Sequence, residues 1–289
     1  MRSSIPLLLL SALIIAGCSR SEPAKKSDTA TYADTMHREH RSDKPTGNEV
    51  AWMQPAQPVV GEDVAYDAGD PATRGYVARP ATGDSGLPGI IVIHEWWGLN
   101  DNIRAMTRRL AGDGYRALAV DLYGGAVATT PDSAKTLTSK AMADMEPGKR
   151  TLRAAISYLK SKGAGRIGVI GWCFGGGWSL QTALDNPRDI DATVIYYGKL
   201  ETDPAKLRAL DMPVLGMFGG RDASIPVEQV RAFEAGMKTA GVNGEVHVYD
   251  SAGHAFANPS GQMYSPDAAT DAWKRTQAFL TRYLSVGEK

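Results

Sequence analysis

The sequence is poor in cysteine and has no excess charge of either sign. Only Cys18 and Cys173 occur among its 289 residues, and 32 Lys and Arg residues balance 32 Asp and Glu residues. A neutral chain has no general electrostatic attraction for nucleic acid or for an anionic membrane surface, so neither is expected as a charge-driven partner. With 43% hydrophobic and 22% charged residues, the composition is that of an ordinary globular protein.

The apolar stretch near the N-terminus is too short to span a bilayer. Arg2 precedes an apolar run from Ile5 to Ala16, which has the length of a signal-peptide core, whereas a spanning helix needs roughly 20 residues. The run ends in IAGC at residues 15–18, which resembles the lipobox of bacterial lipoproteins. This resemblance implies that residues 1–17 are a signal peptide and that Cys18 is lipidated and becomes the mature N-terminus. An ordinary cleaved signal or an uncleaved anchor is the alternative.

Lipidation of Cys18 would fix both the location of the protein and the state of its other thiol. We expect export and attachment to a bacterial membrane, facing the periplasm. Ser19 stands where an aspartate would favour retention in the inner membrane, so the outer membrane is the better expectation. Cys173 would then be the remaining thiol, with no partner for an intramolecular disulfide, and a lone thiol in an oxidising compartment needs another reason to be there.

The segment between the signal and the folded domain is predicted to be a tether. Residues 18–58 are rich in Ser, Lys, Asp, Thr and Pro and show no sustained hydrophobic period. His37 and His40 are three residues apart, as a metal-binding pair can be, but no cluster of other ligand types surrounds them. We therefore interpret them as part of a solvated, charged face of a short helix and expect no metal.

From Val59 onwards, short apolar runs alternate with helical patterns, which is typical of a doubly wound α/β sheet. The inner runs are continuously apolar, as in parallel strands that are buried on both faces. Residues 59–289 are thus predicted to form one domain with a mostly parallel sheet flanked by helices. The predicted strands are Asp63–Tyr66, Gly75–Ala78, Gly89–His94, Arg116–Val120, Arg166–Ile170, Thr193–Tyr197, Val214–Phe218 and Glu245–Tyr249.

The most specific motif is GWCFGG at residues 171–176, between a predicted strand and a helical segment. It has the form of the G-x-S-x-G nucleophile elbow, with Cys173 in place of serine. At such a cramped turn, side chains in place of the glycines would collide with backbone. The turn projects the sulfur outward and aims the amide of Phe174 at the developing oxyanion, and the helix N-terminus that follows favours a thiolate. A structural cysteine in a glycine-rich turn is the alternative.

Two further groups follow in the chain order that an elbow enzyme needs, which is nucleophile, acid, base. Asp222 comes after the predicted strand Val214–Phe218, and His254 comes after the predicted strand Glu245–Tyr249. Catalytic groups in open α/β sheets gather at the carboxyl ends of the strands, so these side chains should meet Cys173 there. Asp250 is an alternative acid, but it belongs to the strand of the base itself, so Asp222 is preferred.

Together these motifs resemble the dienelactone hydrolase (carboxymethylenebutenolidase) family of α/β-hydrolases, over roughly Val59 to Leu284. HEWWGL at residues 94–99 matches the family's glutamate motif. The resemblance implies that Glu95 contacts the resting cysteine and that the amide of Trp96 is the second oxyanion donor. A carboxylate beside a thiol also disfavours the thiolate by repulsion and can accept its S–H bond, which would protect Cys173 from oxidation. A surface loop carboxylate is the alternative for Glu95.

Two arginines that bind the substrate carboxylate in classical members of the family are missing. One should follow DLY at residues 121–123, where this chain has Gly124 and Gly125. The other should lie four residues beyond the catalytic histidine, where this chain has Asn258. The resemblance therefore carries over the catalytic machinery but not the specificity for dienelactone.

We expect a monomeric, cysteine-dependent hydrolase of small esters or lactones that works through an acyl-enzyme and needs no metal or organic cofactor. Cys173 would attack the carbonyl, and His254, oriented by Asp222, would transfer the proton. Four large aromatic residues are candidates to bind the substrate, with plain packing as the alternative: Trp97, Tyr123, Trp172 and Phe256.

Two other functions remain open at this point. A thioesterase or a peptidase could use the same triad, and the sequence does not separate these from an esterase. A non-catalytic lipoprotein could keep the fold as a binding module. A degenerate triad would favour that last alternative, whereas here every member is present in order.

Overall fold

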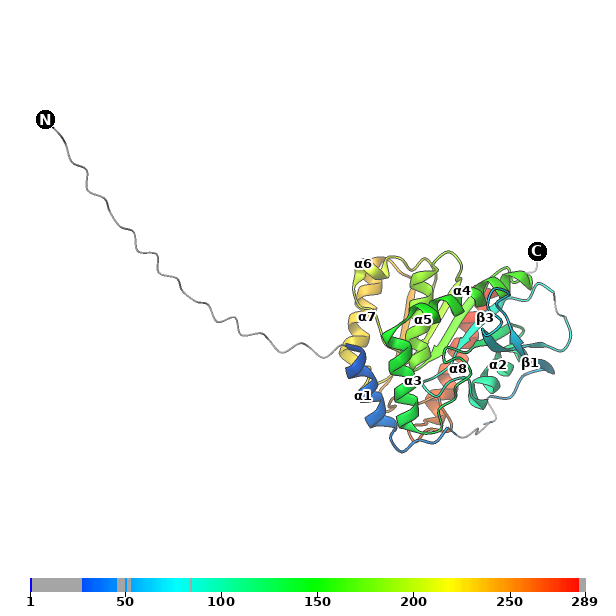
Figure 1. Ribbon diagram of the computed structural model, residues 1–289, viewed down its shortest axis with the longest axis horizontal. Coiled ribbons are helices and arrows are strands. Elements are labelled where there is room, and N and C mark those ends of the chain that lie inside the picture. Colours follow the sequence, from blue (N-terminus) through cyan, green and yellow to red (C-terminus); the bar gives the residue numbers. More distant parts are fainter. Residues whose placement is uncertain (2–27, 46–49, 51–52, 84, 286–289) are drawn as a thin grey trace.

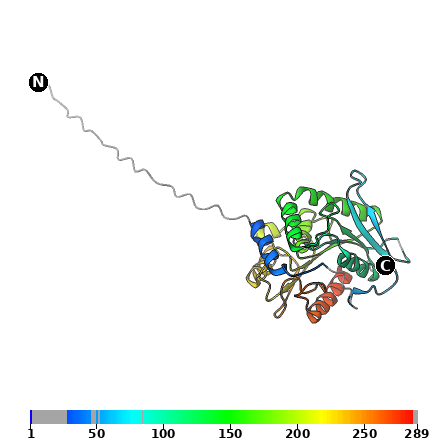
Figure 2. The ribbon, with the colours of Figure 1, turned by 60° about the horizontal axis from the view of Figure 1, so that its bottom comes forward.

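The computed structural model describes residues 1, 28–45, 50, 53–83 and 85–285. Helices pack on both faces of a twisted central sheet (Figures 1 and 2). The predicted lipidation site, Cys18, and the predicted signal peptide beyond Met1 lie outside the described residues. None of the helices in the described ranges is long and apolar enough to cross a bilayer.

The sheet of the described residues has the strand order β1-β2-β4-β3-β5-β6-β7-β8. Strands β3 to β8 are parallel, and β1 and β2 add an antiparallel edge. The prediction of a mostly parallel sheet of about eight strands is confirmed. The strands are β1 (Val59–Ala65), β2 (Arg74–Pro80), β3 (Gly89–Ile93), β4 (Arg116–Val120), β5 (Ile167–Trp172), β6 (Ala192–Tyr196), β7 (Val214–Gly219) and β8 (Gly244–Tyr249).

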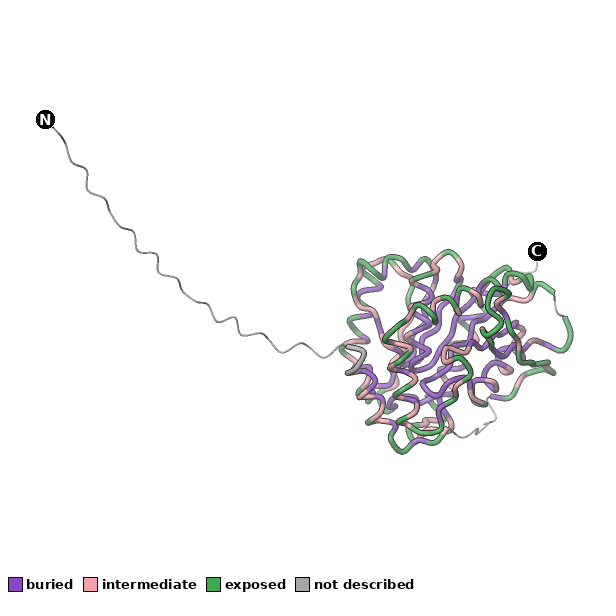
Figure 3. Tube along the Cα trace, viewed as in Figure 1, coloured by how far each residue is buried: buried purple, intermediate pink, exposed green. Residues whose placement is uncertain are grey.

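The core lies along the inner strands. Every residue of the five strands β3, β4, β5, β6 and β7 is buried. Figure 3 shows this buried backbone running through the centre of the domain. Continuous burial on both faces explains why these strands have unbroken apolar sequences. The largest difference from the expected boundaries is at β1, which starts at Val59 rather than Asp63 because an edge strand carries no continuous apolar run.

The helices between the strands begin where the sequence supplies caps. Asn100 accepts a hydrogen bond from the amide of Ile103 and so starts its helix, and Thr130 and Ser133 form a capping box ahead of another. The helices that follow the first strands are α2 (Asp101–Gly112), α3 (Pro131–Ala143), α4 (Glu146–Ser161), α5 (Phe174–Asp185), α6 (Pro204–Leu207), α7 (Val227–Ala240) and α8 (Pro266–Leu284).

The N-terminal segment differs from the expected tether. Within residues 18–58, the chain forms helix α1 (Asp28–His40) and a following turn, and α1 lies beside α3 (Figure 1). Ala33, Met36 and His40 are buried along one face, at the i, i+3, i+7 spacing of a packed helix. The expected solvated histidine face is therefore wrong for His40, which is 2% exposed, while His37 bonds Asp132 at 2.8 Å.

Candidate active site

The predicted elbow forms a sharp turn between β5 and α5. Cys173 has φ 58° and ψ −119°, a conformation that L-residues rarely adopt. A side chain at Gly171 would place its Cβ 2.1 Å from the carbonyl oxygen of Gly175, and one at Gly175 would lie 2.3 Å from the carbonyl oxygen of Ile93. The glycines are therefore required by backbone approaching backbone, which is the steric reason inferred from the sequence.

The surrounding backbone holds this strained residue in place. The amide of Cys173 donates to the carbonyl of Tyr196 on β6 at 2.9 Å, and the carbonyl of Cys173 accepts from Gly176 at 3.0 Å. A residue in such a region costs about 1–3 kcal/mol and persists where its neighbours over-determine it, most often at functional sites. The side chain of Cys173 is 2% exposed.

The two predicted oxyanion donors come from segments that meet. Phe174 is the first residue of α5, so its amide has no partner within the helix. Gly175 lies against the carbonyl oxygens of Ile93 and His94 at the end of β3, and Trp96 follows directly. The start of α5 and the residues after β3 therefore lie together, as a two-amide oxyanion hole requires.

His254 and Asp222 form a buried pair beside the elbow. His254 Nδ1 and Asp222 Oδ2 are 2.7 Å apart, and both side chains have no exposed surface. The other carboxylate oxygen of Asp222 accepts from the amides of Ser224 and Ile225 at 2.8 and 2.9 Å. The competing acid, Asp250, is exposed and makes no such contact with His254 in the described structure. The arrangement selects Asp222 as the partner of His254.

Burial alone would lower the pKa of His254, but the charge and hydrogen bond of Asp222, followed by the interaction with Cys173, raise it well above its ordinary value. A raised pKa means that the imidazolium form is stabilised, which is what a base needs as it accepts a proton from a thiol. The Nε2 atom of His254 is buried and has no hydrogen-bond partner in the described structure. It is the ring nitrogen left for proton transfer.

Glu95 is buried, at 5% exposed, and the hydrogen bond found for its side chain is to Asn258 and not to Cys173. Its carboxylate accepts a hydrogen bond from Asn258 Nδ2 at 2.5 Å, and no hydrogen bond to Cys173 is found among the described residues. Burial raises the pKa of Glu95 to about 7. The charge of Asp43 adds to this increase, whereas His254 and the hydrogen bond from Asn258 oppose it. The residue that replaces a family arginine, Asn258, is thus the partner of Glu95.

The raised pKa makes Glu95 a source of pH-dependent stability. Its pKa is about 7 in the folded chain and 4.5 ordinarily, so between these values the folded state holds a proton that the unfolded state has released. The stabilisation is complete below pH 4.5 and is lost as the pH rises through 7. The side chain in Glu95→Gln is neutral at every pH, so this variant does not lose stability in the way that the wild type does. The difference in the free energy of unfolding, variant minus wild type, should therefore rise by roughly 3 kcal/mol between pH 4.5 and 8.

Urea denaturation of both proteins at the two pH values measures this difference. The exposed Glu62, changed to Gln, is the matched control and should show no comparable change. A Glu95→Gln effect that is the same at both pH values would show that Glu95 is ionised in the folded protein throughout this range.

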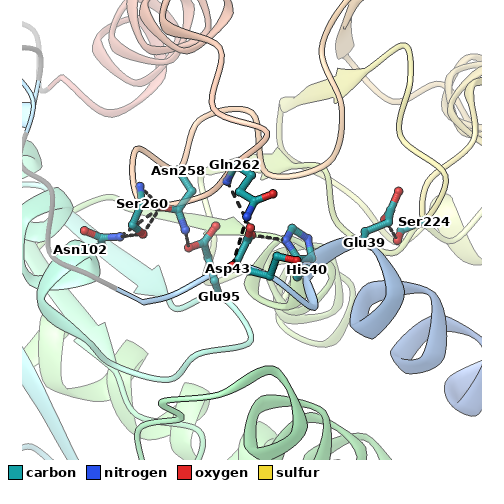
Figure 4. Close-up of polar contacts among 10 residues, drawn as sticks. Glu39, His40, Asp43, Glu95, Asn102, Ser224, Asn258, Ser260 and Gln262 are labelled. Atoms are coloured by element: carbon teal, nitrogen blue, oxygen red, sulfur yellow. Dashed lines mark hydrogen bonds and ion pairs between the residues drawn. The ribbon is translucent and has the colours of Figure 1, made fainter.

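The N-terminal segment adds polar groups that the sequence analysis did not place here. Glu39 accepts hydrogen bonds from the amide of Ala223 at 3.0 Å and from the hydroxyl of Ser224, next to Asp222. His40 Nδ1 lies 2.6 Å from Asp43 Oδ2, and the ring of His40 packs against that of His254 with centroids 5.3 Å apart. Figure 4 shows Glu39, His40 and Asp43 in a row with Glu95 and Asn258.

Carboxylate and imidazole atoms of Glu39, Asp222 and His254 lie within 4.8 Å of one another, a grouping that could hold a metal ion. Each of these groups already bonds to protein. Asp222 holds His254, and Glu39 holds the loop that follows Asp222. The grouping is accounted for by the docking of α1 against the triad, and no step of the chemistry below requires a metal.

The four aromatic residues that were predicted to bind the substrate lie in different surroundings in the structure. Phe256 is fully buried among Tyr196, Tyr197 and Tyr249, and Trp97 packs on Trp96. Trp172 lines a small cavity beside Glu95, and Tyr123 lines a separate hollow next to α3. A further cavity, next to the residue that follows Cys173, is lined instead by Tyr32, Phe174, Trp178 and Lys199, among others.

The dienelactone hydrolase family profile matches residues 73–284. The chain is 33% identical over 234 residues to "Protein usf" of Aquifex pyrophilus, covering 78% of this chain and all of that protein. It is 33% identical over 235 residues to a "Putative carboxymethylenebutenolidase" of Salmonella typhimurium, covering 72% and 82%.

The chain belongs to the dienelactone hydrolase family. A solved structure described as "Putative Dienelactone Hydrolase from Klebsiella pneumoniae" superimposes with a TM-score of 0.71 at 30% identity, covering 78% of this chain and all of that one. Family membership makes the protein a hydrolase that acts on ester or lactone bonds. Helix α1 and its turn precede the residues that the family profile matches, so the groups that they bring to the site lie outside the matched range.

Proposed function

We propose that this dienelactone hydrolase homologue cleaves small esters or lactones through a thioester on Cys173. His254 Nε2 takes the thiol proton as Sγ attacks the carbonyl carbon, and the amides of Phe174 and Trp96 stabilise the oxyanion. The tetrahedral intermediate expels the alkoxide, which takes the proton from His254. Water then attacks the thioester with His254 as base, and the acid is released with the thiol restored.

The observation that carries this proposal is the buried His254–Asp222 pair at 2.7 Å beside a strained cysteine elbow. A structural cysteine would need neither the strained backbone nor a partnered imidazole with one nitrogen unused. The same features disfavour a purely binding role, because a binding module gains nothing from an oriented base.

The cavity beside the elbow suits a small acyl or alcohol group, since its volume is about 220 Å³. Lys199 and Glu201, of opposite charge, both line it. Asn258, at one family arginine position, is neutral and engaged with Glu95, and Arg104 is paired with Asp63 at 2.7 Å. At Asn258 and at Arg104, therefore, no unpaired arginine is available in the described structure to bind a substrate carboxylate.

We predict that an anionic substrate has no advantage over a neutral one. Two arginines that bind a carboxylate would add roughly 1.5–3 kcal/mol per charged hydrogen bond, and about 1.4 kcal/mol is tenfold in affinity, so an intact clamp gives a hundredfold preference or more. Without it, kcat/KM on a neutral ester should equal or exceed that on a dienelactone.

Side-by-side kinetics on a dienelactone and a matched neutral ester check this prediction. A strong preference for the anion would contradict it, and loss of that preference in Lys199→Ala would place the missing cation at Lys199. Arg74, Arg104 and Arg221, changed one at a time, test whether a loop supplies the cation instead.

We also propose that the enzyme is a lipoprotein that faces the periplasm. The support is the IAGC run at residues 15–18 after an apolar stretch of signal-peptide length. In a bacterial host, the protein should sediment with membranes and incorporate labelled palmitate, and Cys18→Ser should abolish both. Cys173→Ser is the matched control and should leave labelling intact. Palmitate labelling that survives Cys18→Ser would reject the anchor.

A further inference from the structure

Tyr32 brings a buried hydroxyl to the active site from outside the range that the family profile matches. It lies on α1, it is 7% exposed, and it lines the cavity of about 220 Å³ together with Phe174. Phe174 follows the nucleophile directly and supplies one proposed oxyanion amide. Tyr32 therefore shares a cavity with the residue that follows the nucleophile, although Cys173 itself is not among the residues that line this cavity.

The hydroxyl of Tyr32 lies within reach of the Cys173 side chain, but it makes no hydrogen bond of good geometry in the described structure. Two other buried tyrosines near the site are satisfied, since Tyr123 bonds Thr138 at 2.9 Å and Tyr196 bonds Thr276 at 2.7 Å. Tyr197, which packs on His254, resembles Tyr32 in having no partner for its hydroxyl in the described structure. A buried polar group without a partner costs about 1–3 kcal/mol, so it needs an explanation such as a ligand or a catalytic role. A substrate in the cavity would supply the missing acceptor.

The chemistry of Tyr32 suits a donor. Burial first, and then the neighbouring Cys173 and Asp222, raise the pKa of its phenol well above the ordinary value. The phenol is therefore protonated at any physiological pH. It can donate one hydrogen bond to an oxygen that gains negative charge, and it cannot compete with His254 as a base.

Contacts along α1 hold Tyr32 in place. Asp34 pairs with Lys135 at 2.6 Å and His37 bonds Asp132, so α1 is tied to α3. Glu39 binds the loop after Asp222, and the turn beyond α1 is fixed because Asp43 accepts from the amide of Gln262 at 3.2 Å. A donor fixed before the reaction needs no reorganisation when charge develops, which is the condition for effective transition-state stabilisation.

We propose that Tyr32 is a further catalytic residue, whose hydroxyl donates a hydrogen bond to the carbonyl oxygen of the substrate as Cys173 attacks. The inference rests on the proposed acyl transfer to Cys173. The proton stays on Tyr32 throughout, and the bond strengthens as the carbonyl oxygen becomes an oxyanion. The N-terminal segment is then a working part of the enzyme and not merely a spacer before the domain.

The test is Tyr32→Phe, which removes the hydroxyl and keeps the packed ring. Steady-state kinetics of the full chain on 4-nitrophenyl acetate should show kcat lowered about 10- to 100-fold, because one oxyanion donor is lost. KM should stay near the wild-type value, because the bond forms mainly in the transition state. Tyr66→Phe is the matched control, since the Tyr66 hydroxyl is also buried without a partner but lines a different hollow; it should keep wild-type kcat.

Alkylation by iodoacetamide separates the acyl oxygen from the thiol as the target of Tyr32. The alkylation passes through no oxyanion, so Cys173 in Tyr32→Phe should react at close to the wild-type rate. Parallel loss of alkylation and hydrolysis would overturn the assignment, because Tyr32 would then act on the thiol. Hydrolysis by Tyr32→Phe at or above the wild-type rate would overturn it as well.

The two proposals fail in different ways. If Cys173→Ala is inactive while Tyr32→Phe is fully active, only the role of Tyr32 is rejected. If Cys173→Ala hydrolyses the ester like wild type, the acyl-enzyme is rejected and the inference with it.

Discussion

Replacing Cys173 with alanine is expected to lower kcat for ester hydrolysis by about 10⁴-fold or more while the protein stays folded. The sulfur is the proposed nucleophile, and its removal leaves only the oxyanion donors and substrate binding. The change removes one buried atom from a turn whose geometry is set by the flanking glycines, so urea denaturation should show a transition close to that of the wild type. Turnover of a chromogenic ester near the wild-type rate would refute the nucleophile assignment.

The other members of the triad extend this expectation. His254→Ala should cost nearly as much as Cys173→Ala, and the double variant should cost little more than either alone, because the two groups act as one unit. Asp222→Asn keeps the shape but removes the charge that raises the pKa of His254. Additive losses in the double variant would mean that Cys173 and His254 do not work in the same step.

Gly175→Ala should be among the most damaging substitutions in the chain. A Cβ at this position would lie 2.3 Å from the carbonyl oxygen of Ile93 and 2.5 Å from that of His94, and backbone atoms cannot rotate away as a flexible side chain can. We expect a loss of roughly 3 kcal/mol in the free energy of unfolding, at the upper end of overpacking costs. Activity should fall as well, because the displaced helix start carries the amide of Phe174.

Gly165→Ala is the matched control for this prediction. Nothing lies within 4 Å of a Cβ at Gly165, so its effect should stay within about 0.5 kcal/mol, as for most surface substitutions. Urea denaturation of both variants measures the difference. Equal effects at the two positions would show that the close approach at Gly175 is not what requires a glycine.

The sequence predicted those parts of the site that depend on a short motif or on a residue's position directly after a strand. The elbow is recognisable because backbone crowding at one turn requires glycine at Gly171 and Gly175. Asp222 and His254 could be placed because each follows a predicted strand, and parallel strands end at one edge of the sheet. Their hydrogen bond, by contrast, joins loops 32 residues apart and is visible only in the folded chain.

The contribution of the N-terminal segment could not be predicted. The stripe of Ala33, Met36 and His40 contains only two apolar residues within a polar helix, so its period is too weak to indicate a packed face. Tertiary contacts override such a weak local signal. The partner of Glu95 was missed for a related reason, because the sequence shows that a carboxylate follows β3 but not which of several polar groups it will bond.

The most direct test of the central claim is to find the acyl group itself. The full chain is mixed with 4-nitrophenyl acetate, quenched in acid during turnover, digested with pepsin and analysed by mass spectrometry. The proposed mechanism predicts an acetyl thioester on the peptide that contains Cys173, absent from Cys173→Ala and chased away when turnover is allowed to finish. An acetyl group that turns over on a different residue, or rapid turnover with the same label in Cys173→Ala, would contradict it.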